Sequence, residues 1–249
     1  MSGKPVRLDR LLSGLGYGSR REIAALAKAG RIAWDGTPVR DGDRKVAAGP
    51  DLSRRLSVDG EPCDPAPGIV IVMNKPLGLV CSHKEAGPLV YDLLPSRWRS
   101  RTPPISSIGR LDKDTSGLLL LTDDGAFLHR VISPRSHVPK RYLADLARPL
   151  SGDEAERFGS GTLMLEGEDK PLAPAELEPL TETRARLTIH EGRYHQVRRM
   201  FAAVGNHVTA LHREAIGGFD LPSDLAPGSW RLMQEDERAA LFAAPLQSV

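Results

Sequence analysis

The sequence predicts an α+β protein in which a small N-terminal module is joined by a linker to a larger domain with a mixed, mainly antiparallel sheet flanked by helices. Apolar residues recur at helical spacing in some segments and at strand spacing in others, and the two kinds alternate irregularly. A stretch rich in proline and glycine, Asp59–Gly68, separates the first helical segments from the later strands. We therefore expect a module at residues 1–62, a linker at 63–68 and a second domain at 69–249.

The N-terminal module should contain two short helices and a hairpin. Four leucines between Leu8 and Leu15 occupy one face of a first helix. Ser19 and Glu22 form the pattern of a capping box, in which each side chain bonds to the backbone N–H of the other residue, and they mark the start of a second helix. The segment Arg31–Val39 has the pattern of a strand, an Asp-Gly turn and a second strand.

The charge of this module suggests a polyanionic partner. Residues 1–62 hold 12 Lys and Arg against 8 Asp and Glu, whereas the remainder holds 22 against 24. Cations on the open side of the helices and hairpin suit a phosphate backbone, although solvated surface charge explains them equally well. The cations with this expected role are Arg7, Arg20, Arg21, Lys28 and Arg31.

The larger domain combines strands and amphipathic helices. An unbroken apolar run, as at Leu118–Thr122, indicates a strand covered on both faces, and alternating apolar residues indicate strands with one buried face. Apolar residues three and four positions apart predict the helices. The expected strands are Ile69–Met73, Leu118–Thr122, Lys140–Leu146 and Thr183–Ile189, and the expected helices are Asp123–Pro134 and Val197–Val204.

Length and composition exclude several classes of protein. With 249 residues and 40% apolar content, the chain suits a globular protein with a proper core. It has no run of 18 apolar residues, and its first ten residues lack the apolar segment of a secretory signal, so we expect a cytoplasmic protein. Cys63 and Cys81 are too few for a disulfide framework, and the histidines lack metal-ligand spacing, so no metal is expected.

The stretch Gly109–Gly125, GRLDKDTSGLLLLTDDG, places four aspartates around a run of leucines. A calcium loop of the EF-hand type fails because two prolines just upstream preclude the entering helix. A phosphatase-like aspartate pair would follow an apolar strand rather than precede it. Turn capping accounts for Asp114, Asp123 and Asp124. Asp112 instead lies in a loop that leads into a buried strand, a position suited to a functional group.

Four further motifs accompany this stretch. NKP at Asn74–Pro76 precedes it, and KRY at Lys140–Tyr142 and LTIHEGRYHQVRRMFAAVGNHV at Leu187–Val208 follow it. The N-terminal module carries RLDRLL with SRREIAALAKAG. Together they resemble the RsuA-type family of ribosomal RNA pseudouridine synthases, with an S4-like RNA-binding module at the N-terminus. The resemblance spans about Pro5 to Arg238. Its last motif is most similar to the branch that modifies 16S ribosomal RNA.

The resemblance implies the isomerisation of a uridine to pseudouridine, with no cofactor. Asp112 is implied as the nucleophile. Arg198 is implied as the cation that pairs with Asp112 and keeps it ionised, and Tyr142 as an aromatic side chain that stacks on the uracil. Attack at uracil C6, attack at ribose C1′ and elimination through a glycal all stay open.

The implied substrate is ribosomal RNA or an assembly intermediate of a ribosomal subunit, with uridine 516 of 16S ribosomal RNA as the expected target. A monomer without an obligatory protein partner is expected. The uridine must leave its stack before it can react, and the arginine-rich segments, Arg97–Arg101 among them, are expected to hold the RNA. A target in 23S ribosomal RNA and a non-catalytic RNA-binding assembly protein are the alternatives. Beyond the N-terminal module, the expected RNA contacts are Arg110, Lys140, Arg193, His195, Gln196 and Arg199.

Overall fold

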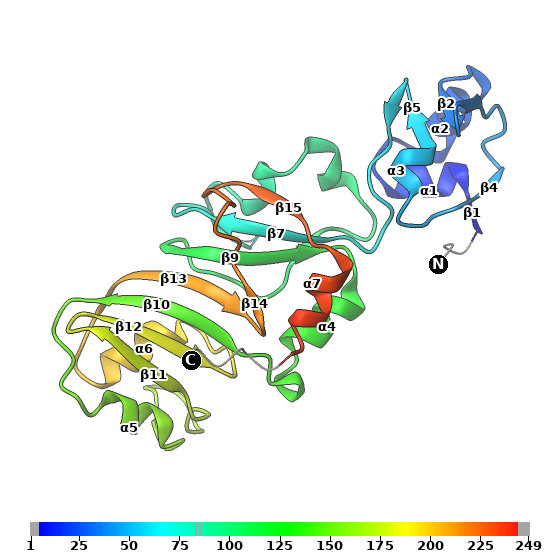
Figure 1. Cartoon of the computed structure of the whole chain (residues 1–249). Coiled ribbons are helices and arrows are strands. Elements are labelled where there is room, and N and C mark those ends of the chain that lie inside the picture. The colour runs from blue at the N-terminus through cyan, green and yellow to red at the C-terminus, as the bar shows by residue number, and fades with distance from the viewer. Residues whose placement is uncertain (1–4, 83, 85, 244–249) are drawn as a thin grey trace. The chain divides into compact units, whose positions relative to one another are not determined.

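The computed structural model describes residues 5–82, 84 and 86–243 (Figure 1). They divide into two compact units. The first comprises residues 1–70, 94–106 and 122–125, and the second comprises residues 71–93, 107–121 and 126–249. The α+β class predicted from the sequence is confirmed. Residues 94–106 and 122–125 belong to the same compact unit as the N-terminal module, whereas the sequence analysis placed them in the second domain.

Among its described residues, the first unit contains three short α-helices, a 3-10 helix at Ser96–Ser100 and two small sheets. Strand β1 pairs with β4, and the second sheet has the order β3-β2-β5-β6, with every pair antiparallel. The elements are β1 Pro5–Arg7, α1 Leu8–Gly14, α2 Arg20–Lys28, β2 Ile32–Trp34, β3 Thr37–Pro38, β4 Lys45–Ala47, α3 Leu52–Arg55, β5 Leu56–Val58 and β6 Glu61–Pro62. The leucines of the first predicted helix are buried in the core between them.

Helix α2 begins as its sequence predicts. The backbone N–H of Glu22 donates to Ser19 Oγ at 3.3 Å, and the backbone N–H of Ser19 donates to Glu22 Oε2 at 2.7 Å. The capping box is thus confirmed, and two of the N–H groups that a helix start leaves without intrahelical partners are bonded.

The proline-rich segment is bonded along its length rather than free. The backbone N–H of Asp64 donates to the Tyr17 hydroxyl at 3.0 Å. The Asp64 carboxylate pairs with Arg97 at 2.7 Å, and the Arg97 guanidinium lies 4.2 Å from the centre of the Tyr17 ring. Arg97, which the sequence analysis assigned to RNA binding, is therefore paired within the first unit.

The second unit is built on a nine-stranded mixed sheet with the order β11-β12-β10-β13-β9-β7-β15, in which β14 pairs with β13 and β8 with β9. Strand β13 runs parallel to β9. The antiparallel pairs are β10 with β12, β10 with β13, β11 with β12, β13 with β14 and β15 with β7. The strands are β7 Val70–Lys75, β8 Ser106–Ser107, β9 Thr115–Thr122, β10 Lys140–Leu146, β11 Glu176–Thr181, β12 Arg184–Ile189, β13 Val208–Ile216, β14 Phe219–Asp220 and β15 Trp230–Leu232. The predicted alternation is confirmed: Tyr142, Ala144 and Leu146 are buried on one face of β10.

Among the described residues, four α-helices accompany this sheet: α4 Gly125–Ile132, α5 Glu154–Gly159, α6 Gln196–Ala203 and α7 Glu235–Ala240. Two 3-10 helices lie at Val90–Leu93 and Pro134–Ser136. Helices α5 and α6 lie at the end of the sheet that β11 and β12 form, where the rings of Phe158 and Phe201 meet edge to face at 5.3 Å (Figure 1). Helices α4 and α7 lie side by side, and Phe127 contacts Phe242 edge to face at 6.1 Å.

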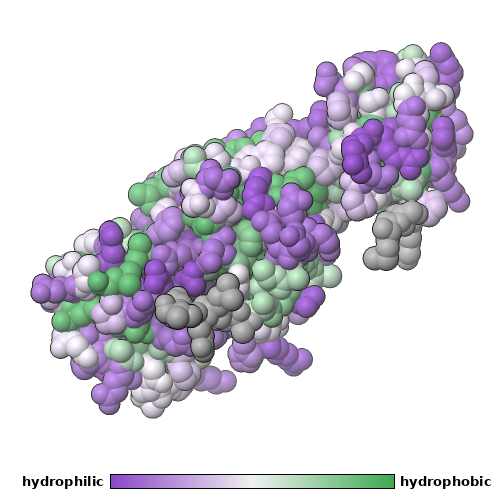
Figure 2. Space-filling model, in the orientation of Figure 1, coloured by the Kyte–Doolittle hydropathy of each residue, from purple (hydrophilic) through white to green (hydrophobic). Residues whose placement is uncertain are grey.

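The face drawn in Figure 2 is largely hydrophilic, and smaller apolar patches are interspersed among the hydrophilic side chains. Within the described part of the chain, every helix is too short or too polar to span a bilayer.

Candidate active site

The loop that carries Asp112 is fixed through its backbone. Lys75 ends β7, and its side chain is completely buried. Its Nζ donates to the carbonyl oxygens of Asp112 at 3.0 Å, Thr115 at 2.8 Å and Pro76 at 3.1 Å. Burial lowers the pKa of Lys75, although nearby carboxylates favour its charged form. Three bonds from one buried ammonium group therefore hold the loop without engaging the Asp112 carboxylate.

The Asp112 side chain is 32% exposed, and its Oδ1 lies 3.3 Å from His195 Nε2. Among the residues that the structure describes, His195 is the one side chain that pairs with this carboxylate. His195 precedes α6 with φ 49° and ψ 32°, in the left-handed region that a residue with a side chain rarely adopts. The carboxylate is thus oriented on one side and open on the other.

The resemblance implies that Arg198 pairs with Asp112, but in the structure Arg198 pairs with Asp114. Its guanidinium contacts Asp114 Oδ2 at 2.9 Å and donates to the carbonyl oxygens of Asp114 at 3.1 Å and Val208 at 3.0 Å. The expected pair between Arg198 and Asp112 is therefore wrong for this structure, because the loop turns the Asp114 carboxylate toward α6. The Nε of Arg198 is buried and bonded to none of the described residues.

Tyr142 lies opposite Arg213 in the pairing of β10 with β13. Both side chains are buried, and the Tyr142 hydroxyl accepts a long hydrogen bond of 3.4 Å from Arg213 Nη1. Arg213 Nε donates to the Leu118 carbonyl at 2.7 Å, while Nη2 is buried and lacks a bond to the described residues. A buried guanidinium with a free N–H group beside an aromatic ring is suited to an electron-rich ligand.

Gly117 allows strand β9 to lie directly against Arg213 of β13. It pairs with Arg213 in the parallel β9–β13 register, and its φ of 103° is in the region that favours glycine. A Cβ at this position would lie 2.4 Å from the Arg213 carbonyl oxygen. Close approach of the two backbones therefore requires glycine here.

Lys140 lies two residues from Tyr142 on the same face of β10. Burial, together with the nearby charge of Arg213, lowers the pKa of Lys140 to about 8. A partly buried ammonium group of this kind retains its charge at neutral pH and is available to an anion such as phosphate.

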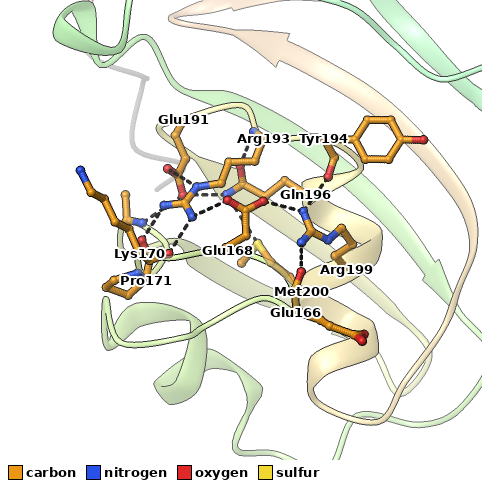
Figure 3. Close-up of polar contacts among 11 residues, drawn as sticks. Glu166, Glu168, Lys170, Pro171, Glu191, Arg193, Tyr194, Gln196, Arg199 and Met200 are labelled. Atoms are coloured by element: carbon orange, nitrogen blue, oxygen red, sulfur yellow. Dashed lines mark hydrogen bonds and ion pairs between the residues drawn. The ribbon is translucent and has the colours of Figure 1, made fainter.

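Arg193, Gln196 and Arg199 make a network of bonds inside the second unit (Figure 3). Arg193 pairs with Glu168 at 3.3 Å, and Arg199 pairs with the same carboxylate at 2.9 Å. The buried amide of Gln196 donates to Glu191 at 3.0 Å. These side chains thus tie the loop before α6 to residues 166–171, and their expected contacts with RNA stay predictions.

In the first unit, most of the expected RNA contacts are also paired. Arg7 and Arg20 both bind the Asp9 carboxylate, at 2.9 and 2.8 Å, and Arg31 binds Asp59 at 2.5 Å. Arg21 and Lys28 are exposed on α2. In the second unit, Arg110 is an exposed residue two positions before Asp112. Their roles likewise stay predictions.

Arg213 and Lys75 are described residues of this site to which the sequence analysis gave no role. The sequence does contain a sign of the role of Arg213. In β13 the side chains of Leu211, Arg213 and Ala215 are buried on one face, so a cation occupies a position where strand alternation predicts an apolar residue. Among the described residues, the structure contains no group of three His, Cys, Asp or Glu side chains arranged to hold a metal ion.

Comparisons with known proteins identify the family. Residues 69–203 match the sequence model of the RNA pseudouridylate synthase family, and residues 6–50 match that of the S4 domain. The chain is 43% identical to ribosomal small subunit pseudouridine synthase A of Escherichia coli K12, over 95% of this chain and all of that protein. It is 41% identical to an uncharacterized RNA pseudouridine synthase of Bacillus subtilis, over 93% of this chain and 96% of that protein.

One solved structure extends the likeness to the fold. A crystal structure of a pseudouridylate synthase matches with a TM-score of 0.66 and 34% identity, over 95% of this chain and 99% of that one. The family match covers more than half of the chain and includes Asp112, Tyr142 and Arg198. The chain therefore belongs to the RNA pseudouridylate synthase family, and the protein is an isomerase.

Proposed function

We propose that this protein isomerises a uridine of small-subunit ribosomal RNA to pseudouridine, with Asp112 as the nucleophile. The observation that carries the role of Asp112 is its setting: Lys75 holds the loop backbone, and the carboxylate stays open with His195 on one side. The relatives named ribosomal small subunit pseudouridine synthase A, matched over their whole length, support the substrate class. Uridine 516 of 16S ribosomal RNA is the proposed target.

The proposed reaction balances within one nucleotide. The bond between N1 and C1′ breaks, the uracil turns, and C5 forms a bond to C1′. The proton on C5 is released, and N1 takes up a proton. A carboxylate supplies an electron pair to uracil C6 or to ribose C1′, or acts as the base in a glycal route.

Three further side chains have proposed roles in the reaction. The Tyr142 ring stacks on the uracil that has left the RNA helix. Arg213, with a buried N–H group to spare, stabilises negative charge on the detached base. Arg198 acts through Asp114 and the loop backbone, so it positions the loop that carries the nucleophile.

The S4 match supports RNA binding by the first unit, and we assign this contact to exposed cations such as Arg21 and Lys28. Lys140, with a pKa of about 8, is a proposed phosphate contact. We further propose a cytoplasmic monomer that acts on ribosomal RNA or an assembly intermediate without an obligatory protein partner.

Release of tritium from C5 of uridine tests the proposal. The protein is incubated with 16S or 23S ribosomal RNA that carries tritium at C5. The wild type should release tritium from the 16S RNA, and Asp112→Ala should lower the rate more than about 10³-fold, as loss of a nucleophile does elsewhere. Full release by Asp112→Ala would refute the assigned role, and binding without release would favour the non-catalytic alternative.

Pseudouridine mapping tests the target. Ribosomal RNA from cells that lack the gene should contain an unmodified uridine at position 516, which the wild-type gene restores and Asp112→Ala does not. An unmodified position in 23S ribosomal RNA instead would overturn the proposed substrate.

A further inference from the structure

Tyr194 is the most exposed large apolar or aromatic side chain among the described residues, at 70%. Its ring stacks on the imidazole of His195, with ring centres 3.8 Å apart and planes inclined by 18°. Figure 3 shows the ring directed away from the polar network around Glu168. An aromatic face of this size, left open to solvent beside a catalytic loop, suggests a ligand with a flat aromatic surface.

The surrounding network holds this ring pair in position. The Tyr194 carbonyl accepts from Arg199 at 3.2 Å, and the backbone N–H of Arg193 donates to the Gln196 side chain at 2.9 Å. Both arginines are tied to Glu168. The left-handed backbone of His195 persists only where neighbours fix it. The exposed tyrosine is therefore presented by a constrained backbone, which reduces the entropy lost when a ligand stacks on it.

One ring of the pair, the His195 imidazole, contacts the proposed nucleophile Asp112. His195 Nε2 lies 3.3 Å from Asp112 Oδ1, and Tyr194 covers a face of the same imidazole. The ring separation of 3.8 Å is close to the spacing of stacked bases, about 3.4 Å. Exposed cations, Arg110 and Lys113, flank Asp112 in its loop and suit the phosphates of the same strand.

We infer that Tyr194 and His195 form a stacking platform for an unpaired nucleobase adjacent to the target uridine. The base adjacent to the target uridine stacks on this platform while the uridine itself is turned toward Asp112. This inference rests on the proposed function for the identity of the central uridine. Stacking tolerates any base, so the platform contributes affinity rather than sequence choice.

Kinetics of tritium release separate the platform from a structural role. Tyr194→Ala should raise KM for the ribosomal RNA about 10-fold or more while kcat stays within about 3-fold, since stacking on one aromatic ring contributes to binding. Tyr194→Phe keeps the ring and should recover most of the lost affinity. Leu180→Ala, which removes another exposed apolar side chain on β11, is the matched control and should leave KM unchanged. A wild-type KM for Tyr194→Ala overturns the inference.

Fluorescence distinguishes failure of the platform from failure of the proposed function. The probes are single-stranded RNA oligomers with 2-aminopurine on the 5′ or the 3′ side of a central uridine. Wild type and Tyr194→Phe should quench one of them, and Tyr194→Ala should not. Quenching by a wild type that releases no tritium would refute the proposed function and keep the platform. Tritium release with identical quenching by wild type and Tyr194→Ala would refute the platform alone.

Discussion

The two ends of strand β9 carry aspartates in opposite environments. Beyond its C-terminal end, Asp123 and Arg101 form an ion pair at 2.8 Å with both side chains only 1% exposed. Asp123 Oδ1 also accepts from the backbone N–H groups of Gly68 at 2.8 Å and Ile69 at 2.9 Å. Before its N-terminal end, Asp112 has His195 as its side-chain partner among the described residues, and a third of its side chain is exposed.

This difference separates a structural carboxylate from one that is available for chemistry. The oxygens of Asp123 accept four hydrogen bonds, two from Arg101 and two from the backbone, so its electron pairs are occupied. Asp112 sits on a backbone that another residue holds, so its own oxygens are not needed for the fold. Two aspartates lie at each end of β9, so their partners rather than the type of residue decide the role.

The largest expected effect comes from breaking the buried pair. Arg101→Ala leaves the Asp123 charge buried without its partner and should lower the free energy of unfolding by about 3 to 5 kcal/mol. Urea unfolding monitored by circular dichroism measures it. The double variant Arg101→Met with Asp123→Leu removes both charges and should be more stable than Arg101→Ala. Equal losses in the two variants would show that electrostatics does not govern this site.

Lys75→Met tests what holds the Asp112 loop. The methionine has a similar length but no donor, so the carbonyl oxygens of Pro76, Asp112 and Thr115 lose their bonds. The free energy of unfolding should fall by about 1 to 3 kcal/mol, and tritium release per folded molecule should fall as well, because the nucleophile is no longer held. Lost stability with an unchanged rate would mean that Lys75 supports the fold without positioning Asp112.

Acid should reveal a second structural carboxylate, Asp9. Hydrogen bonds from Arg7, with further ones from Arg20, hold the pKa of Asp9 well below its usual range. Because the folded pKa is the lower one, the ionised group stabilises the fold above the unfolded pKa of about 4, and this stabilisation is lost as the pH falls below that value. The free energy of unfolding should therefore decline more steeply below about pH 4 in wild type than in Asp9→Asn. Parallel declines would contradict the assignment.

Asp114→Asn should have the smallest effect. The Asp114 side chain is 68% exposed, and Arg198 keeps its bonds to two carbonyl oxygens when the carboxylate is lost. An exposed pair of this kind contributes less than about 1 kcal/mol, and tritium release should slow only a few-fold. Abolished release in Asp114→Asn, measured at wild-type stability, would mean that the wrong aspartate of the loop has been assigned.

Local features of the sequence predicted local features of the structure. The capping box at Ser19 is confirmed, because both partners lie within one helical turn. The alternation in β10 identified the buried face that includes Tyr142, because side chains alternate between the faces of any strand. The central motif identified the loop before β9 as the place to look for a functional carboxylate.

Partners distant in the sequence were not predictable. Asp123 had been interpreted as a turn cap, which is wrong: its partners Arg101 and Gly68 lie 22 and 55 residues away. Arg198 was paired with the wrong aspartate, because Asp112 and Asp114 are two residues apart and only the turn of the loop decides between them. Spacing in one sequence carries no information on either choice.

The rate of tritium release per folded molecule, compared between Asp112→Asn and Asp123→Asn, tests the central claim most directly. Asp112→Asn should fold with wild-type stability and release tritium more than about 10³-fold more slowly. Asp123→Asn should be less stable, yet its folded fraction should release tritium within about 3-fold of the wild-type rate. Normal release by Asp112→Asn, or a loss confined to Asp123→Asn, would contradict the account.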